Sequence, residues 1–207
     1  MPFLEESQIT ALGFKDQVTL KSVLDDIQNN TSLEYAANAL EPGKRPLPVG
    51  SNSPFMVIGD KPSEFDLDHY FDSPDAQKEL ETFCGNIGIS RSEAYLTYIL
   101  KYPTSEKSER LPTPAGKEHA KAFLHREIYA VNPEIIILVG DYAQKIVSKS
   151  FTVDLSNGIQ KVVLPLKIKG TELKYEAYVA CVPSFAADTS TISPIVNRIK
   201  LNWKFVH

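Results

Sequence analysis

The sequence predicts an α/β fold, a three-layer α-β-α sandwich with a central, mostly parallel sheet of four or five strands. Two observations lead to this prediction. Segments with the periodicity of helices and of strands alternate along the chain, which is the pattern of strand–helix–strand units. The run "EIIILVG", residues 134–140, is apolar at nearly every position. Such a run is typical of a strand buried on both faces of a parallel sheet.

The length of the chain sets the number of domains. The chain has 207 residues, and 43% of them are hydrophobic, which is enough for the core of one α/β domain. We therefore expect a single domain over residues 1–207. Residues 1–50 are expected to form an N-terminal helical extension that packs on it.

Helices are predicted where apolar residues recur every three to four positions between start and stop signals. The clearest case opens with Ser73 as N-cap and Pro74 at the first helical position, and it stops at Gly88. We expect Asp141 to cap a later helix and Ser193 to cap the last one. In chain order, the predicted helices span residues 16–30, 73–88, 112–133, 141–151 and 193–207.

Strands are predicted where β-branched, aromatic and other apolar residues form short runs. Residues 39–54 are rich in proline, glycine and serine and predict a loop before the first strand. Two strands joined by a turn at Lys169 and Gly170 account for residues 161–184. The other predicted strands span residues 55–59, 93–102 and 134–140.

Composition argues against several classes of protein. A net charge of −4 does not suggest a protein coated by nucleic acid, although it leaves room for a local basic face. No run of 18 apolar residues and no secretory leader pattern is found, so we expect a cytoplasmic protein of bacterial or viral context. Cys84 and Cys181 lie in apolar surroundings and are too few for a thiolate metal site. We expect reduced core cysteines, no metal and no cofactor.

Ligands of an open parallel sheet bind beyond the carboxyl ends of its strands. Asp60 and Asp141 each follow a glycine at such an end. Asp141 begins a predicted helix, so capping explains it best. Asp60 is followed by Pro62 and an acidic loop, which favours a functional carboxylate. The four candidate strand ends are residues 59–63, 101–105, 140–143 and 182–186.

The order and spacing of these strand ends resemble the uracil-DNA glycosylase superfamily, most closely its iron–sulfur (family 4) branch. The resemblance covers roughly residues 33–199 and implies the three-layer fold of that family. It also implies hydrolysis of the N-glycosidic bond of a base flipped out of DNA. The segments that carry it are "VIGDKPS" (57–63), "YFDSPDAQKEL" (70–80), "GISRSEAYLTYILKYP" (88–103), "NPEIIILVGDYA" (132–143) and "CVPSFA" (181–186).

The resemblance implies roles for single residues. Asp60 stands where the family has a catalytic glutamate, and Phe71 where an aromatic ring stacks on the base. Tyr98 replaces the asparagine that reads the edge of uracil, and Val182 replaces a histidine. Plain strand or core packing remains the alternative for Tyr98 and Phe71. Valine cannot donate a hydrogen bond to the departing base, so a backbone N–H, Ser184 or Tyr98 would have to do so.

The family's four cluster cysteines are absent from this chain. The matching places hold tyrosine and alanine near residues 35–37, then Tyr102 and His119. Without these thiolates no iron–sulfur cluster can form.

The resemblance also suggests contacts with DNA. Phosphates would be met by Lys61, Ser63, Lys101 and Ser184. Phe185 lies in the loop with which the family fills the vacated base stack. It is a candidate wedge, with a core contact as the alternative.

Two functions are compatible with these residues. The first is a DNA glycosylase for a damaged or modified base, with pyrimidines bulkier than uracil among the candidates, because Tyr98 argues against tight uracil selection. The second is a catalytically inactive relative that binds DNA or a protein through the same fold. Asp60 favours the first function and Val182 the second. As the partner we expect DNA, single- or double-stranded, with a flipped base, and we expect no contact with membranes and a monomer.

Overall fold

Five strands form one sheet at the centre of the protein, in the order β2-β1-β3-β5-β4. The computed structural model describes residues 18–29, 47–62, 69–101, 114–155, 158–168, 170–187 and 189–206. Four strands run parallel, and β4 is antiparallel to β5, which confirms the mostly parallel sheet. The strands are β1 (Phe55–Gly59), β2 (Ala94–Tyr98), β3 (Ile135–Val139), β4 (Ile159–Ile168) and β5 (Thr171–Val182).

The central strand is β3, as its composition predicts. It pairs with β1 on one side and with β5 on the other. Ile135 to Leu138 are all buried, because helices cover both faces of the sheet at this point. The predicted turn between the last two strands is also confirmed: Ile168 pairs with Thr171, and Gly170 takes a positive φ of 84°.

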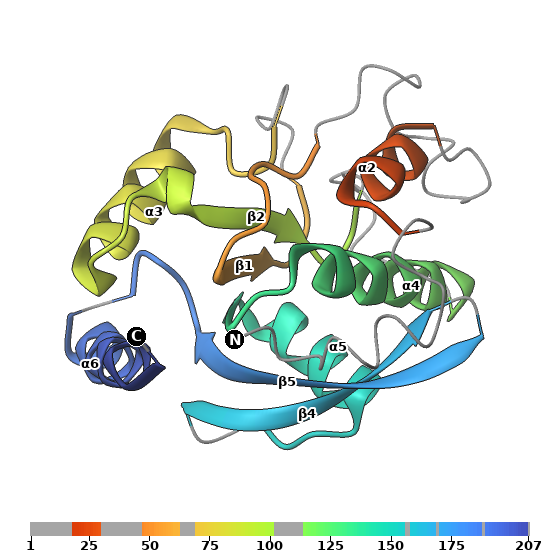
Figure 1. Cartoon of the computed structure of the whole chain (residues 1–207). Helices are drawn as coiled ribbons and strands as arrows, with labels where there is room; N and C mark the ends of the chain where they lie inside the picture. Colours follow the sequence, from red (N-terminus) through yellow and green to blue (C-terminus); the bar gives the residue numbers. More distant parts are fainter. Residues whose placement is uncertain are drawn as a thin grey trace.

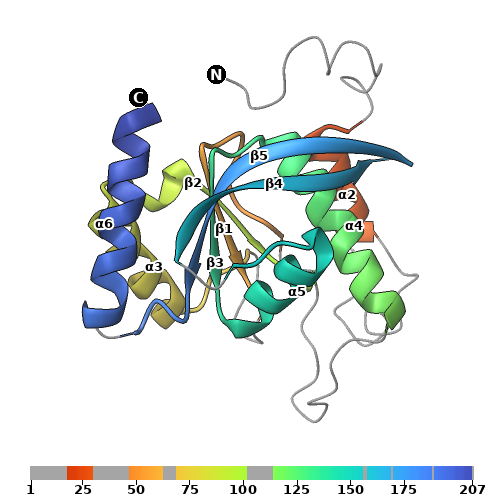
Figure 2. The ribbon, with the colours of Figure 1, turned by 90° about the horizontal axis from the view of Figure 1, so that it is seen from below.

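Helices cover both faces of the sheet, which gives the three layers. The covering helices α3 and α6 lie on one face, and α4 and α5 lie on the other, with α2 against α4 (Figures 1 and 2). A single 3-10 turn, Arg91–Glu93, precedes β2. The helices are α2 (Leu20–Asn29), α3 (Pro74–Ile87), α4 (Pro114–Val131), α5 (Asp141–Phe151) and α6 (Thr189–Val206).

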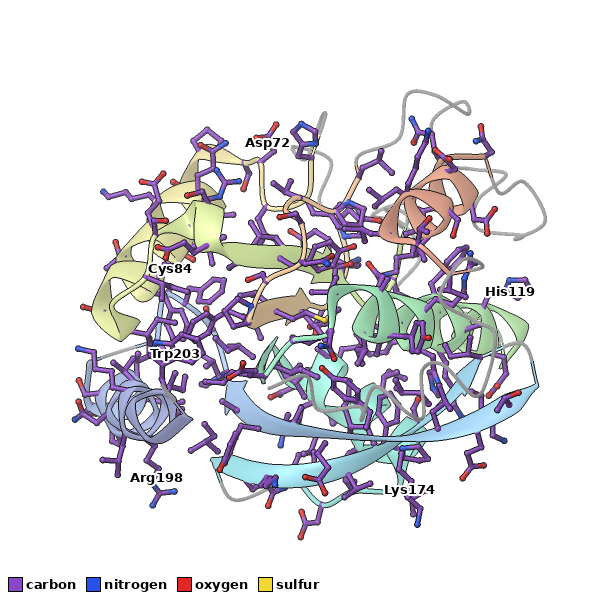
Figure 3. The ribbon with its side chains drawn as sticks, viewed as in Figure 1. Asp72, Cys84, His119, Lys174, Arg198 and Trp203 are labelled. Atoms are coloured by element: carbon purple, nitrogen blue, oxygen red, sulfur yellow. The ribbon has the colours of Figure 1, made fainter. Side chains whose placement is uncertain are left out.

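Each face of the sheet buries its own apolar cluster. Met56 and Ile58 of β1 point towards α4 and α5, whereas Phe55 and Val57 point towards α3 and α6. This alternation follows from the two-residue period of a strand. On the α3–α6 face, Trp203 of α6 packs on Phe55 with ring centroids 4.6 Å apart (Figure 3).

The signals at helix ends were predictive for α3 but not for the last helix. Ser73 caps α3 through the N–H of Ala76, and Gly88 ends it in the left-handed conformation, as predicted. Ser193 as the cap of the last helix is wrong, because α6 already begins at Thr189. Pro194 therefore lies inside the helix, where it lacks the N–H for one backbone hydrogen bond. The extra turn buries Ile192 in the α3–α6 cluster, which favours the longer helix.

The chain before β1 contributes α2 and a short stretch beside β2. Asp26 of α2 is paired with Arg126 of α4 at 2.6 Å. Val49 exchanges backbone hydrogen bonds with Leu96 of β2, so this stretch borders the edge of the sheet. No helix in the described part of the chain has the length and apolar character needed to cross a membrane.

Candidate functional site

The carboxyl ends of β1, β3 and β5 meet around Gly140. The N–H of Gly140 donates to the carbonyl of Val182 at 2.9 Å, which joins the ends of β3 and β5. A Cβ on Gly140 would lie 2.6 Å from the Asp60 carboxylate, so that carboxylate lies directly against its backbone. Gly140 also has a φ of +97°, which favours glycine. Gly140 therefore contacts both Val182 and Asp60, so three of the four predicted strand ends lie together.

The Asp60 carboxylate caps a helix that is distant in sequence. Its Oδ1 accepts the N–H of Ala143 at 2.6 Å, and Ala143 is the third residue of α5. The N-cap residue of α5 is Gly140, which has no side chain to do this. The prediction that Asp141 is the cap is therefore wrong: Asp141 is the first helical residue and is exposed. The loop after Asp60, which favoured a functional carboxylate over a cap, does not prevent Asp60 from capping α5.

Opposing effects act on the charge of Asp60. Partial burial is the largest and raises the pKa of Asp60 above its usual value. The backbone N–H groups of Ala143 and Tyr142 lower this pKa, while the neighbouring charge of Asp141 raises it and Lys145 lowers it. Burial, and then the charge of Asp60, raise the pKa of Tyr142 to about 12. Asp60 is therefore an ionisable group held in place by a helix N-terminus.

An aromatic cluster covers the other side of the same strand end. Phe71 is 5% exposed, and Tyr98 is 7% exposed. Their rings stack with centroids 4.3 Å apart and an interplanar angle of 22°. A Cβ on Gly59 would lie 2.7 Å from the Tyr98 ring and 2.8 Å from the Phe71 ring. The structure therefore brings Phe71 and Tyr98, two of the predicted base-binding residues, into contact in a buried stack.

Val182 and Phe185 border this aromatic cluster. Val182 is 1% exposed and belongs to the same apolar cluster as Phe71 and Tyr98. Phe185 is half-buried, with ring centroids 5.1 Å from Phe83 and 6.2 Å from Phe71. The core contact considered for Phe185 is thus present.

The predicted DNA-contacting residues differ in their placement. Lys61 follows Asp60 and is exposed. Ser184 is also exposed, and its hydroxyl accepts the N–H of Ala186 at 3.1 Å. Ser63 lies outside the described residues.

The structure contradicts a phosphate-binding role for Lys101. Its side chain is fully buried and forms an ion pair with Glu127 of α4. Its ammonium group also donates to Thr97 Oγ1 at 2.8 Å and to the carbonyl of Tyr98 at 2.5 Å. Burial lowers the pKa of Lys101, and Glu127 opposes this. A lysine held in this way cannot reach a DNA phosphate.

Sequence reasoning missed Glu127, the partner of Lys101. Glu127 also accepts hydrogen bonds from Tyr95 at 3.0 Å and from Thr97 at 2.6 Å. An acidic residue in the middle of an amphipathic helix is ordinarily exposed. Its burial therefore follows only from the position of α4 over β2.

Metal-binding side chains do not gather in the part of the chain that the structure describes. No group of three or more histidine, cysteine, aspartate or glutamate residues has the proximity of a metal site there. Burial raises the pKa of the Cys84 and Cys181 thiols to about 11, so neither is a ready thiolate. His119, at one of the places that match cluster cysteines, is exposed on α4. Tyr102 and residues 35–37 lie outside the described residues.

Comparison with known proteins shows the family to which the chain belongs. The family model described as "Uracil DNA glycosylase superfamily" matches residues 47–194. A "Type-4 uracil-DNA glycosylase" of Archaeoglobus fulgidus is 28% identical over 81 residues, 39% of this chain and 40% of that protein. A "DNA polymerase" of Bacillus phage SP01 is 37% identical over 75 residues, 36% of this chain.

The aligned parts span 40% of the Archaeoglobus protein and 8% of the phage protein. The family match is much longer: it runs from the stretch beside β2 into α6 and includes all four strand ends of the site. Together with the three-layer fold, this match shows that the chain belongs to the uracil DNA glycosylase superfamily, with a likeness to its type-4 branch.

Proposed function

We propose that this protein is a DNA glycosylase, which hydrolyses the N-glycosidic bond of a damaged or modified base turned out of DNA. The observation that carries the proposal is Asp60, a half-buried carboxylate at the carboxyl end of β1, fixed by the N-terminus of α5. Membership of the superfamily supports it, and both relatives carry the names of enzymes that act on DNA.

Asp60 suits the charge that develops in this reaction. As the bond between the sugar C1′ and the base nitrogen breaks, the base leaves with the electron pair and the sugar becomes positive. A fixed carboxylate stabilises this cation and orients the water that adds to C1′. The proton of the water passes to the carboxylate, and the base is protonated on release, so the products are a free base and an abasic sugar.

The exposed residues beside Asp60 are candidates for the remaining contacts. Lys61 and Ser184 would bind backbone phosphates, as would Ser63. The Ser184 hydroxyl uses its oxygen to accept the N–H of Ala186, so its own proton remains available for donation. Phe185 would have to leave Phe83 to enter a base stack, at the cost of that ring contact.

A panel of oligonucleotides with single modified bases, cleaved with alkali at any abasic site, tests this proposal. Asp60→Asn should lower the excision rate by about 10² or more, the usual effect of removing a positioned catalytic group. The asparagine oxygen can still accept the Ala143 N–H, so folding should be preserved. Asp25→Asn is the matched control, because Asp25 is an exposed aspartate of α2, a helix that packs on α4, and it should leave the rate unchanged. An unchanged rate in Asp60→Asn would contradict the mechanism.

A second candidate function is DNA or protein binding without base excision. The observation that favours it is the Tyr98 ring, which covers the face of Phe71 on which a base would stack. If the protein binds DNA but excises no base of the panel, this second function replaces the first.

A further inference from the structure

The Tyr98 ring makes a full stacking contact with Phe71. The two centroids are 4.3 Å apart and the planes differ by 22°, which is the offset-stacked arrangement of aromatic pairs. A flipped base stacks on an aromatic side chain in the same way. Because Phe71 is 5% exposed, no second aromatic ring can be placed on its covered face without moving Tyr98.

The hydroxyl of Tyr98 adds a hydrogen bond at the edge of the ring. It accepts the backbone N–H of Phe71 at 3.2 Å. Phe71 has a φ of 59°, a conformation that a phenylalanine adopts only when its surroundings require it. An oxygen at the edge of a six-membered ring, bonded to a fixed backbone donor, is also what a pyrimidine carbonyl would provide in this place.

The other residues that surround the Tyr98 ring also pack closely against it. Gly59 leaves room for the Tyr98 ring against the end of β1, where any Cβ would come within 2.7 Å of it. Tyr70 lies at 4.9 Å on another side, tilted by 57°. The Tyr98 ring is therefore surrounded by the aromatic face of Phe71, by the backbone of Gly59 and, at its edge, by the backbone N–H of Phe71.

We propose that Tyr98 is a built-in occupant of a pyrimidine-binding pocket: its phenol ring holds the place of the base, and the pocket admits a base only when this ring is displaced or removed. The proposal rests on the proposed function in that it concerns the same site. It identifies the ligand class as a planar six-membered heterocycle with an exocyclic oxygen. It also makes Tyr98 the residue that limits which base can enter.

The test is binding of free uracil to the DNA-free protein. Ligand-detected NMR and the shift of the melting temperature both measure this binding. Tyr98→Ala removes the ring and leaves the Phe71 N–H without its acceptor, so it should bind uracil in about the millimolar range expected for so small a ligand. The wild type should bind none. Tyr98→Phe is the matched control: it keeps the ring and lacks only the oxygen, so it should also exclude uracil. Tyr98→Ser offers a second opened pocket if the alanine variant does not fold.

Three results would overturn the proposal. One is uracil binding to the wild type or to Tyr98→Phe in the same range as to Tyr98→Ala. Another is no uracil binding by either opened variant. The third is an opened variant that takes benzene but not uracil, because a plain apolar void accepts benzene without a polar partner.

This measurement is separate from the test of base excision. Uracil binding to Tyr98→Ala requires neither Asp60 nor DNA. If the wild type excises no base but Tyr98→Ala binds uracil, the glycosylase function fails and the occupied pocket stands. If the wild type excises a base and neither opened variant binds uracil, only the present inference fails.

Discussion

A single carboxylate, that of Asp60, serves an element 83 residues further along the chain. Its oxygen receives the N–H of Ala143 in the first turn of α5, where Gly140 offers no side chain. The first N–H groups of a helix have no partner within the helix, so this bond stabilises α5. The same bond fixes the carboxylate for any chemistry. The structural role of Asp60 and its proposed catalytic role can therefore be separated only by choosing the right substitution.

We expect Asp60→Ala to lower the free energy of unfolding by about 1 kcal/mol, the usual effect of losing a helix cap. Asp60→Asn keeps an acceptor for the Ala143 N–H and should not show this loss. Urea unfolding at pH 7 measures the difference between the two variants. Equal stability of Asp60→Ala and Asp60→Asn would show that the bond to Ala143 contributes nothing.

The pH dependence of Asp60→Asn provides a further check. Folding raises the pKa of Asp60, so the carboxyl contributes stability at low pH that is lost as the pH rises through its folded pKa. Asparagine does not titrate. The stability of Asp60→Asn relative to the wild type should thus increase as the pH is raised from about 3 to 7. A decrease over this range would show that ionised Asp60 is stabilising.

At the scale of elements, a buried ion pair connects β2 to α4. Lys101, just beyond the end of β2, pairs with Glu127 of α4, and both side chains are fully buried. Tyr95 and Thr97 of β2 add hydrogen bonds to the same carboxylate. The hydroxyl of Tyr70 donates to the carbonyl of Lys101 at 2.7 Å, which fixes the chain that precedes α3. The ion pair thus orders the segment next to the candidate site.

Lys101→Met should destabilise the protein by about 3–5 kcal/mol, because it leaves the Glu127 charge buried and unpaired. It should not change the salt dependence of DNA binding by the folded protein. Lys61→Met is the matched surface variant, and it should leave the stability nearly unchanged. If Lys61 contacts a phosphate, this variant should reduce the slope of the logarithm of the DNA-binding constant against the logarithm of the salt concentration by about 1. Urea unfolding and DNA titrations at several salt concentrations measure both properties. If Lys101→Met also reduced this slope, Lys101 would contact a phosphate in spite of its burial.

At the scale of the whole molecule, His125 joins three elements of the α4–α5 side. Its Nδ1 accepts the N–H of Lys167 in β4 at 2.6 Å, and its ring stacks on Phe151 of α5 at 4.8 Å. Burial is the largest cause that lowers the pKa of His125 to about 4, and the charges of Lys121 and Lys167 lower it further. At neutral pH this histidine is therefore an uncharged core residue.

We expect the free energy of unfolding to fall by about 3 kcal/mol as the pH is lowered from 7 to 4, through His125 alone. The unfolded chain takes up this proton near pH 6.5, whereas the folded protein resists it until about pH 4. The contribution of uncharged His125 to stability is complete above pH 6.5 and is lost as the pH falls from there to about 4. His125→Asn, whose amide oxygen can accept the Lys167 N–H, should flatten this part of the profile. His119→Asn, at an exposed histidine on the same helix, should reproduce the wild-type profile.

The sequence by itself determined the elements, the central place of β3 and the superfamily. These follow from local patterns: apolar runs, helical spacing, the Ser73 and Gly88 signals, and five segments in a fixed order. It also placed Asp60 and Val182 at strand ends, and the resemblance to the family added Phe71 and Tyr98. A parallel sheet places all such ends at one edge, so no pairwise distance is needed to expect them there.

Only the tertiary structure decided what these residues contact. The bond from Asp60 to α5, the stack of Tyr98 on Phe71 and the pair of Lys101 with Glu127 each join residues more than 25 positions apart. Local patterns carry no information about such contacts, because they depend on which helix lies over which strand. The start of α6 depends on such a contact as well. The helix begins at Thr189, where it buries Ile192, although the proline in its second turn favours a later start.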